Sequence, residues 1–157
     1  MKFAIPATVL SLFAFANAAS VLPRQAGFCP EASRFGILGV KPTNLSPGDK
    51  FTITANFTCG INQYNIVPKY IDYYIEVPEN VNNGHEPPIL LARRTFSKSH
   101  GDVDKFTTHL PDAFYFTGAA YTVQMDITYA INGTLGKPFY VVGGTEAGVN
   151  ITDPNSI

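Results

Sequence analysis

The sequence predicts an all-β domain folded as a two-sheet antiparallel sandwich of about seven strands. Apolar and polar residues alternate in several short runs, which is the period of a strand with one buried face. Twelve Pro and 13 Gly residues are spread between these runs and mark turns. Beyond residue 18, no run of ten or more residues has apolar side chains at the spacing of a helix, so we expect very little helix.

The strongest strand signal lies between Tyr121 and Ile131, where odd-numbered residues are apolar and even-numbered residues are mostly polar. Asn132-Gly133 follows, and Asn-Gly is favoured in two-residue hairpin turns because both positions tolerate positive φ. The pattern therefore predicts a hairpin whose second strand covers residues 137–142. We expect the odd-numbered side chains of its first strand to share a dry interior with those of residues 51–59.

Five further strands are predicted at residues 35–40, 51–59, 70–77, 89–96 and 105–110. In the third of these, Tyr70 and Tyr74 belong to the outward face. Segments rich in Pro, Gly, Asn and Asp predict loops at residues 41–50 and 78–88, and a polar loop is expected at 60–68. Val149 and Ile151 add a last edge.

Seven short strands make an immunoglobulin-like topology the most economical arrangement. In such domains a Tyr at the start of a late strand hydrogen-bonds back to the preceding corner. Tyr121 follows the connection that begins at Leu110-Pro111 and is the candidate for this role. The alternative is that Tyr121 is simply a core residue.

Residues 1–18 are predicted to be a secretory signal peptide, with Lys2, an apolar run from Ala4 to Ala16, and small residues at the cleavage position. That run is shorter than the roughly 20 residues needed to span a bilayer. Residues 19–33 are expected to form an arm or short propeptide with cleavage after Arg24, residues 34–152 the sandwich, and residues 153–157 a loose end. We therefore expect a secreted protein without a membrane anchor.

Two features agree with secretion. The mature chain has two cysteines, Cys29 and Cys59, and an oxidising compartment favours the one pairing they allow. Four Asn-x-Ser/Thr sequons are candidate N-glycosylation sites. Their asparagines are Asn44, Asn56, Asn132 and Asn150.

The composition argues against several classes of function. Eleven basic residues balance 12 acidic ones without a basic stripe, so nucleic acid is not expected as a partner. His85, His100 and His109 fall in or beside polar segments, and no nucleophile motif is present. Asp72, Glu76, Asp102, Asp104, Asp112 and Asp126 are the carboxylates from which a glycosidase pair could be drawn. We predict no catalytic residues, no metal and no cofactor.

Two aromatic groups are candidate binding sites. Phe114, Tyr115 and Phe116 lie in a predicted connection, where exposed aromatic side chains would mark a contact site. The alternative is that this segment closes one end of the sandwich. Tyr70 and Tyr74 share the outward face of one strand and would suit a sugar or a protein partner, although Tyr is also favoured on strands for local reasons.

The sequence resembles small fungal secreted proteins with an immunoglobulin-like sandwich and, more loosely, the necrosis-inducing secreted effector family of plant-associated fungi. Two segments carry the resemblance. They are Lys41-Pro42 leading to Ser46-Pro47-Gly48-Asp49-Lys50-Phe51-Thr52-Ile53, and Leu110-Pro111 running to Gly118-x-x-Tyr121-Thr122-Val123. The resemblance implies action by contact with host proteins. Lipid-binding secreted sandwiches are similar around the same segments but usually have more cysteines.

Three functions follow as hypotheses. The first is a non-catalytic extracellular interaction protein, such as a fungal effector that contacts a host or cell-surface protein. The second is a ligand-binding sandwich for lipid or glycan. The third is a secreted hydrolase or metal oxidoreductase, which would need the histidines and carboxylates to meet in one cleft.

Overall fold

The computed structural model describes residues 28–82, 84 and 86–153. The predicted signal peptide, the cleavage after Arg24, His85 and the last four residues lie outside this part of the chain. Within the described ranges the chain forms nine strands, one α-helix and two 3-10 helices, η1 (Glu31–Ser33) and η2 (Lys98–His100). No helix among them is both long and apolar enough to cross a membrane.

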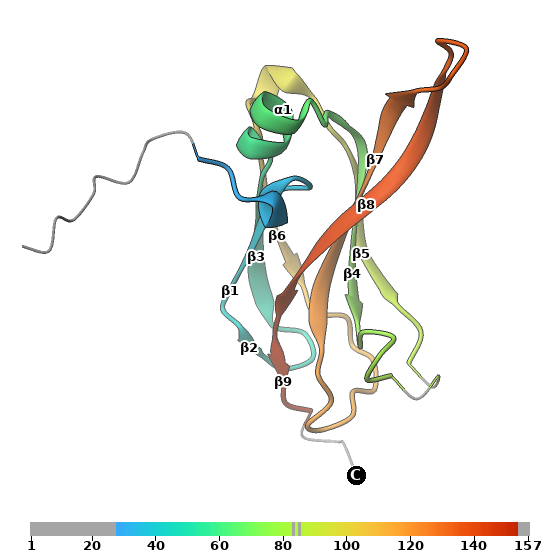
Figure 1. Cartoon of the computed structure of the whole chain (residues 1–157). Helices are drawn as coiled ribbons and strands as arrows, with labels where there is room; N and C mark the ends of the chain where they lie inside the picture. The colour runs from blue at the N-terminus through green and yellow to red at the C-terminus, as the bar shows by residue number, and fades with distance from the viewer. Residues whose placement is uncertain (1–27, 83, 85, 154–157) are drawn as a thin grey trace, which may run out of the picture.

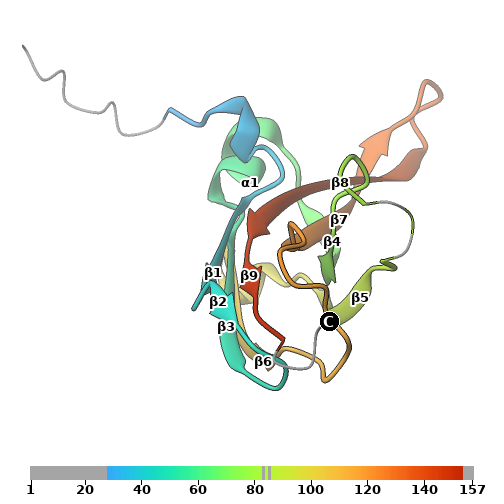
Figure 2. The same ribbon diagram turned by 90° about the horizontal axis from the view of Figure 1, so that it is seen from below.

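The strands form two packed antiparallel sheets (Figures 1 and 2). The first sheet has the order β1 (Ile37–Lys41), β3 (Lys50–Asn56), β6 (Val103–His109). The second has the order β5 (Ile89–Thr95), β4 (Pro68–Glu76), β7 (Thr122–Asn132), β8 (Pro138–Gly148). This crossed strand order confirms the immunoglobulin-like sandwich.

A third, smaller pairing lies in a segment that the sequence predicts as loop. β2 (Asn44–Leu45) pairs in parallel with β9 (Asn150–Ile151). Leu45 and Ile151 are both buried, so this pairing closes the edge of the core. The contribution of Val149 and Ile151 to a last edge agrees with the prediction.

The core forms where the alternating runs of the two sheets face each other. Phe51, Ile53 and Ala55 on β3 and Val123, Met125 and Ile127 on β7 are each at most 1% exposed. Ile71, Tyr73 and Ile75 of β4 complete the second sheet's inner face. Burial of these side chains supplies the main stabilising force of the fold.

The predicted dry face of β7 ends earlier than expected. Tyr129 is half-buried and Ile131 is 39% exposed, so the expectation that every odd-numbered side chain up to Ile131 faces the core is wrong for the end of the strand. The reason is length: β7 and β8 each have 11 residues, about twice the usual strand. Residues 130–142 form a hairpin arm that projects past the rest of the sandwich (Figure 1).

The turn of this arm also differs from the prediction. Asn132 pairs with Pro138, which leaves a loop of residues 133–137 instead of a two-residue turn. The amide of Gly133 donates to the Lys137 carbonyl at 3.0 Å, and the positive φ of 73° falls at Gly136. Gly136, and not the Asn132-Gly133 pair, is therefore the residue of the turn with a left-handed backbone conformation.

The strand predicted at residues 51–59 ends at Asn56. The chain then forms α1 (Thr58–Tyr64), where a polar loop was expected. The side chain of Asn56 accepts a hydrogen bond from the Thr58 amide at 2.9 Å and so favours the turn into the helix. Cys59 consequently lies on α1 and not on the core face of a strand.

The disulfide between Cys29 and Cys59 is formed, as predicted. It joins the N-terminal segment to α1, and a second contact supports it: the Tyr64 hydroxyl donates to the Cys29 carbonyl at 2.8 Å. The N-terminal segment is thus tied to α1, which lies at the same end of the sandwich as the hairpin arm (Figure 1).

A polar network joins the two sheets at the edge of the core. The Asp104 carboxylate on β6 accepts a hydrogen bond from the Tyr73 hydroxyl at 3.0 Å and from Arg94 Nε at 2.8 Å. Arg94 also lies over the Phe106 ring, with its guanidinium carbon 4.7 Å from the ring centre, which is within the range of a cation–π contact. Burial, together with the negative charge of Asp104, raises the pKa of Tyr73.

Candidate contact surfaces

The hairpin arm carries the densest group of exposed apolar side chains in the described structure. Leu135 at the tip is 89% exposed, Val142 66%, Tyr140 54% and Phe139 48%. Ile131 on the arm, and Val67 and Tyr70 beside it, are also exposed. Large exposed apolar patches mark interaction sites in soluble proteins.

Strand register sorts these residues onto two faces. Ile131 pairs with Phe139, and both lie on the side that is continuous with the core face of the sheet. Ala130 pairs with Tyr140, and these point to the opposite, outward side. The arm therefore presents apolar side chains on both faces, with Leu135 at its end.

Tyr70 belongs to the outward face of this surface. It pairs with Thr128, which in turn pairs with Val142, so the three lie in one row across β4, β7 and β8. Lys69 lies between two aromatic rings, with Nζ 4.3 Å from the Tyr140 ring centre and 5.3 Å from that of Tyr70. The ammonium also donates to the Tyr140 hydroxyl at 2.9 Å, which raises the pKa of Lys69.

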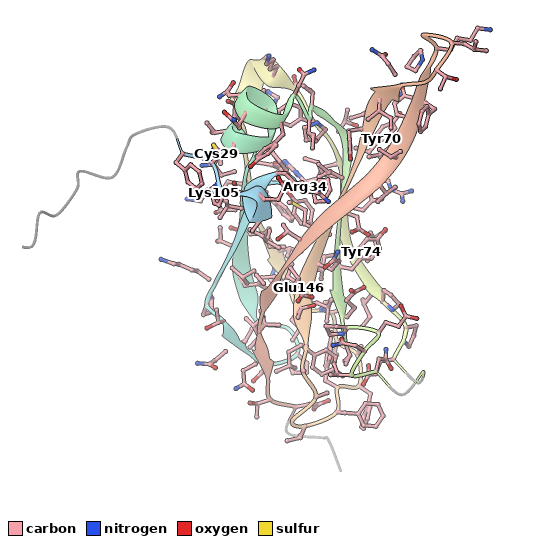
Figure 3. All side chains as sticks on the ribbon, in the orientation of Figure 1. Cys29, Arg34, Tyr70, Tyr74, Lys105 and Glu146 are labelled. Atoms are coloured by element: carbon pink, nitrogen blue, oxygen red, sulfur yellow. A yellow bond between two sulfur atoms is a disulfide. The ribbon has the colours of Figure 1, made fainter. Side chains whose placement is uncertain are left out.

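The other predicted tyrosine, Tyr74, lies further along the same outward face (Figure 3). It is half-buried, and desolvation with the nearby Asp72 charge raises its pKa. Between the two tyrosines, Asp72 accepts two hydrogen bonds from Arg93, at 2.7 and 2.9 Å. Tyr70 is therefore grouped with Tyr140 and Val142 across the strands, whereas Tyr74 adjoins this ion pair.

The aromatic triplet lies at the opposite end of the sandwich and divides by exposure. Phe114 and Phe116 are 50% and 47% exposed and contact each other edge to face, with ring centres 5.0 Å apart. Tyr115 between them is fully buried, and its hydroxyl donates to the Pro111 carbonyl at 3.0 Å. Burial and the charge of Asp112 raise the pKa of Tyr115 to about 12. Tyr115 closes the sandwich end, while the two phenylalanines face solvent.

Tyr121 makes the corner contact that the sequence predicts and is also a core residue. Its hydroxyl accepts a hydrogen bond from the Phe116 amide at 3.1 Å and donates to Glu86 Oε1 at 2.7 Å. The ring is 2% exposed and packs edge to face on Tyr115. Burial and the hydrogen bond to Glu86 raise the pKa of Tyr121. Tyr121 therefore both makes the corner hydrogen bond and belongs to the core.

A surface cavity of about 360 Å³ adjoins this corner. Val77, Val81 and Phe116 form apolar walls, and Glu86 contributes a carboxylate. This volume is at the lower end of the range for small-molecule sites. The cavity lies at the end of the sandwich, beside the residues that precede β7.

Some of the residues considered for catalysis lie close together in the described structure: Asp72 and Asp126 are cross-strand partners on β4 and β7, and His100 and Asp104 line one small cleft. The two described histidines do not meet each other. His100 precedes β6 and His109 ends it, so the two lie at opposite ends of a strand. Asp72 pairs with Arg93, and Asp104 pairs with Arg94. Within residues 28–82, 84 and 86–153, no three His, Cys, Asp or Glu side chains are placed to hold a metal ion together.

The four sequon asparagines are all exposed. Asn44 and Asn150 lie side by side on β2 and β9, and Asn150 Nδ2 donates to Asn44 Oδ1 at 3.2 Å. Asn56 precedes α1, and Asn132 is the last residue of β7, at the base of the arm's loop.

Sequence reasoning identified Tyr70 but missed the exposed side chains of the neighbouring hairpin arm, namely Ile131, Leu135, Phe139, Tyr140 and Val142. One signal was present. The alternating run from Tyr121 to Ile131 is longer than a strand needs to cross a small sandwich, so part of it had to overhang.

Comparisons with known proteins identify no family. No family model and no curated protein matches the chain. Among solved structures, a superoxide reductase (neelaredoxin) from Ignicoccus hospitalis is similar, with 12% sequence identity and a TM-score of 0.47 over 74% of this chain and 80% of that one. A point variant of the same protein matches equally, over 79% of its chain. A likeness this distant says nothing about activity.

Proposed function

We propose that this protein is a secreted, glycosylated, non-catalytic interaction protein that binds another extracellular protein through its hairpin arm. The observation that carries the proposal is the group of exposed apolar side chains on the arm, led by Leu135, Phe139 and Ile131. The predicted signal peptide, the disulfide and the sequons support an extracellular setting.

The arm also favours a polypeptide as its partner. β8 is an edge strand of its sheet, and between Pro138 and Val142 it pairs with β7 alone among the described strands. Alternate main-chain groups of an edge strand point away from the sheet and suit the backbone of another chain. A lipid or a sugar would leave those groups unused.

Charge narrows the chemistry of that partner. The stretch between Asp126 and Glu146 contains no acidic residue and one basic residue, Lys137, and Lys69 lies beside it on β4. A partner surface with an apolar centre bordered by carboxylates would complement this arm. In line with the effector resemblance, we propose that this partner is a host or cell-surface protein.

The test compares capture by two variants of the secreted full chain. Leu135→Ser removes the apolar tip, and Leu90→Ser removes a 50% exposed side chain from β5, away from the arm. A partner captured from host extracellular fluid by the wild type should be lost with Leu135→Ser and retained with Leu90→Ser. Equal capture by both variants would count against the arm.

A second candidate function is ligand binding at the end cavity. Its support is the apolar wall of Val77, Val81 and Phe116 beside the Glu86 carboxylate, a combination suited to an amphipathic ligand such as a lipid or a glycan. Native mass spectrometry of the secreted protein tests it. A co-purifying small molecule that disappears in Phe116→Ser would favour this function over the first.

A further inference from the structure

The outward face of the arm and of the neighbouring strand β4 carries exposed aromatic and apolar side chains. Tyr140, Val142 and Tyr70 are 54%, 66% and 42% exposed. They share one face because Tyr70 and Val142 both pair with Thr128, and Tyr140 lies two residues further toward the tip. Such a continuous apolar strip on a secreted protein usually has a partner.

The Lys69 side chain holds the aromatic part of this strip in place. The Lys69 ammonium donates to the Tyr140 hydroxyl at 2.9 Å and lies over the rings of Tyr140 and Tyr70. The contact restricts the Tyr140 ring and leaves a hydrogen-bond donor between the two tyrosines. An aromatic face beside a charged donor matches a sugar ring, which has apolar C–H faces and polar edges.

Asn132 lies next to the strip on the same face. It pairs with Pro138, and the preceding outward pair is Ala130 with Tyr140, so Asn132 and Tyr140 are diagonal neighbours. Diagonal neighbours on adjacent strands are about 7–8 Å apart, within reach of a long side chain or an attached group. Asn132 is exposed and begins the sequon Asn132-Gly133-Thr134.

We propose that the N-linked glycan of Asn132 folds back on the arm, with its first N-acetylglucosamine packed on the Tyr140 ring and the next sugars extending toward Val142 and Tyr70. The inference rests on the secretion in the proposed function. In the attachment step, Asn132 Nδ2 loses a proton and bonds to C1 of the first sugar. The bond from C1 to the diphosphate of a lipid-linked oligosaccharide breaks, and the diphosphate leaves with the electron pair.

This arrangement divides the arm between two partners. The glycan covers the outward face, and the opposite face with Ile131 and Phe139, together with the tip at Leu135, stays free for a protein.

The test uses the full chain secreted from a eukaryotic host and trimmed by an endoglycosidase to one N-acetylglucosamine per site. Protons held over an aromatic ring resonate upfield in the NMR spectrum. We expect the Asn132-linked sugar to show such upfield shifts and cross-peaks to the Tyr140 ring, while the Asn150-linked sugar does not. Tyr140→Ser should abolish the upfield shifts, whereas Phe139→Ser, on the opposite face, should leave them.

Three results would overturn the inference. An Asn132-linked sugar with the same shifts as the Asn150-linked sugar would show that the glycan extends into solvent. An unoccupied Asn132 in a protein glycosylated at other sequons would remove the glycan but leave secretion intact. Absence of sugar at every sequon, with the first 18 residues still attached, would contradict the proposed secretion as well.

Discussion

Leu135→Ser should separate the stability of this protein from its proposed binding. Leu135 is 89% exposed, so folding hides only about a tenth of its surface. Full burial of a Leu side chain contributes about 1.5–3 kcal/mol, which leaves about 0.2–0.3 kcal/mol for the part hidden here. The free energy of unfolding should therefore fall by less than about 0.5 kcal/mol, within the range of surface substitutions.

Ile127→Ala is the matched comparison, because Ile127 lies in the middle of β7, outside the arm, and is fully buried. Removing a buried Ile side chain costs about 2–5 kcal/mol. Binding of the partner should show the reverse order of sensitivity, with the larger effect at Leu135. If a partner buries Leu135, the Leu135→Ser change should raise the dissociation constant of the complex roughly 10- to 150-fold.

The chain has no Trp, so urea unfolding is best followed by far-UV circular dichroism of the purified protein. A loss above about 1 kcal/mol for Leu135→Ser would refute the reasoning, because it would require the tip to be packed in the folded state. A loss below about 1 kcal/mol for Ile127→Ala would refute the boundary drawn between core and arm.

Three further predictions concern the body of the sandwich. Asp104→Ala should lower the free energy of unfolding by about 1–3 kcal/mol, measured by urea unfolding, because it leaves the Tyr73 hydroxyl and Arg94 without their acceptor; a change below about 0.5 kcal/mol would argue that this network contributes little. Stability should fall as pH rises from 10 toward 12, because the unfolded state releases the tyrosyl proton near pH 10 whereas the pKa of buried Tyr115 is about 12 and those of Tyr73 and Tyr121 are also raised; Tyr115→Phe should make that decline less steep, and an unchanged profile would contradict it. Replacing both disulfide cysteines by serine should cost up to about 3.6 kcal/mol in the chain-entropy account of a 30-residue separation; an unchanged thermal midpoint would show that α1 holds the N-terminal segment without it.

The sandwich could be predicted because its strands obey one rule over their whole buried length. From Tyr121 to Ile127, each odd-numbered side chain is buried in the sheet interface, as the alternating pattern requires. The pattern identifies a face but not what covers it. The same alternation continues through Tyr129 to Ile131, where no second sheet lies opposite, and only the structure shows that the strand has left the core there.

Short local contacts account for the other differences. The helix α1 has seven residues, too few for helical periodicity to appear in the sequence, and the Asn56 side chain and the disulfide decide its position. At the arm's turn, Asn132-Gly133 and Gly136 both offer turn chemistry, and the pairing of Asn132 with Pro138 selects the longer loop.

The candidate contact residues were predicted least well, because exposure depends on neighbours far along the chain. Tyr70 gains its setting from Tyr140 and Lys69 through the pairing of β4 with β7 and β7 with β8. In the triplet at the other end, Tyr115 turns inward to bond the Pro111 carbonyl, while Phe114 and Phe116 stay outside. Three consecutive aromatic residues in a sequence do not indicate which of them is buried and which are exposed.

The most direct test of the arm as a contact surface is site-specific photo-crosslinking of the purified protein in host extracellular fluid. A photoreactive residue at position 135 should capture a discrete protein, and unlabelled wild type should compete for it, whereas the Leu135→Ser protein should not. The same group at position 90, on an exposed part of β5, should capture nothing discrete. Identical crosslinking from positions 135 and 90 would contradict a binding role for the arm.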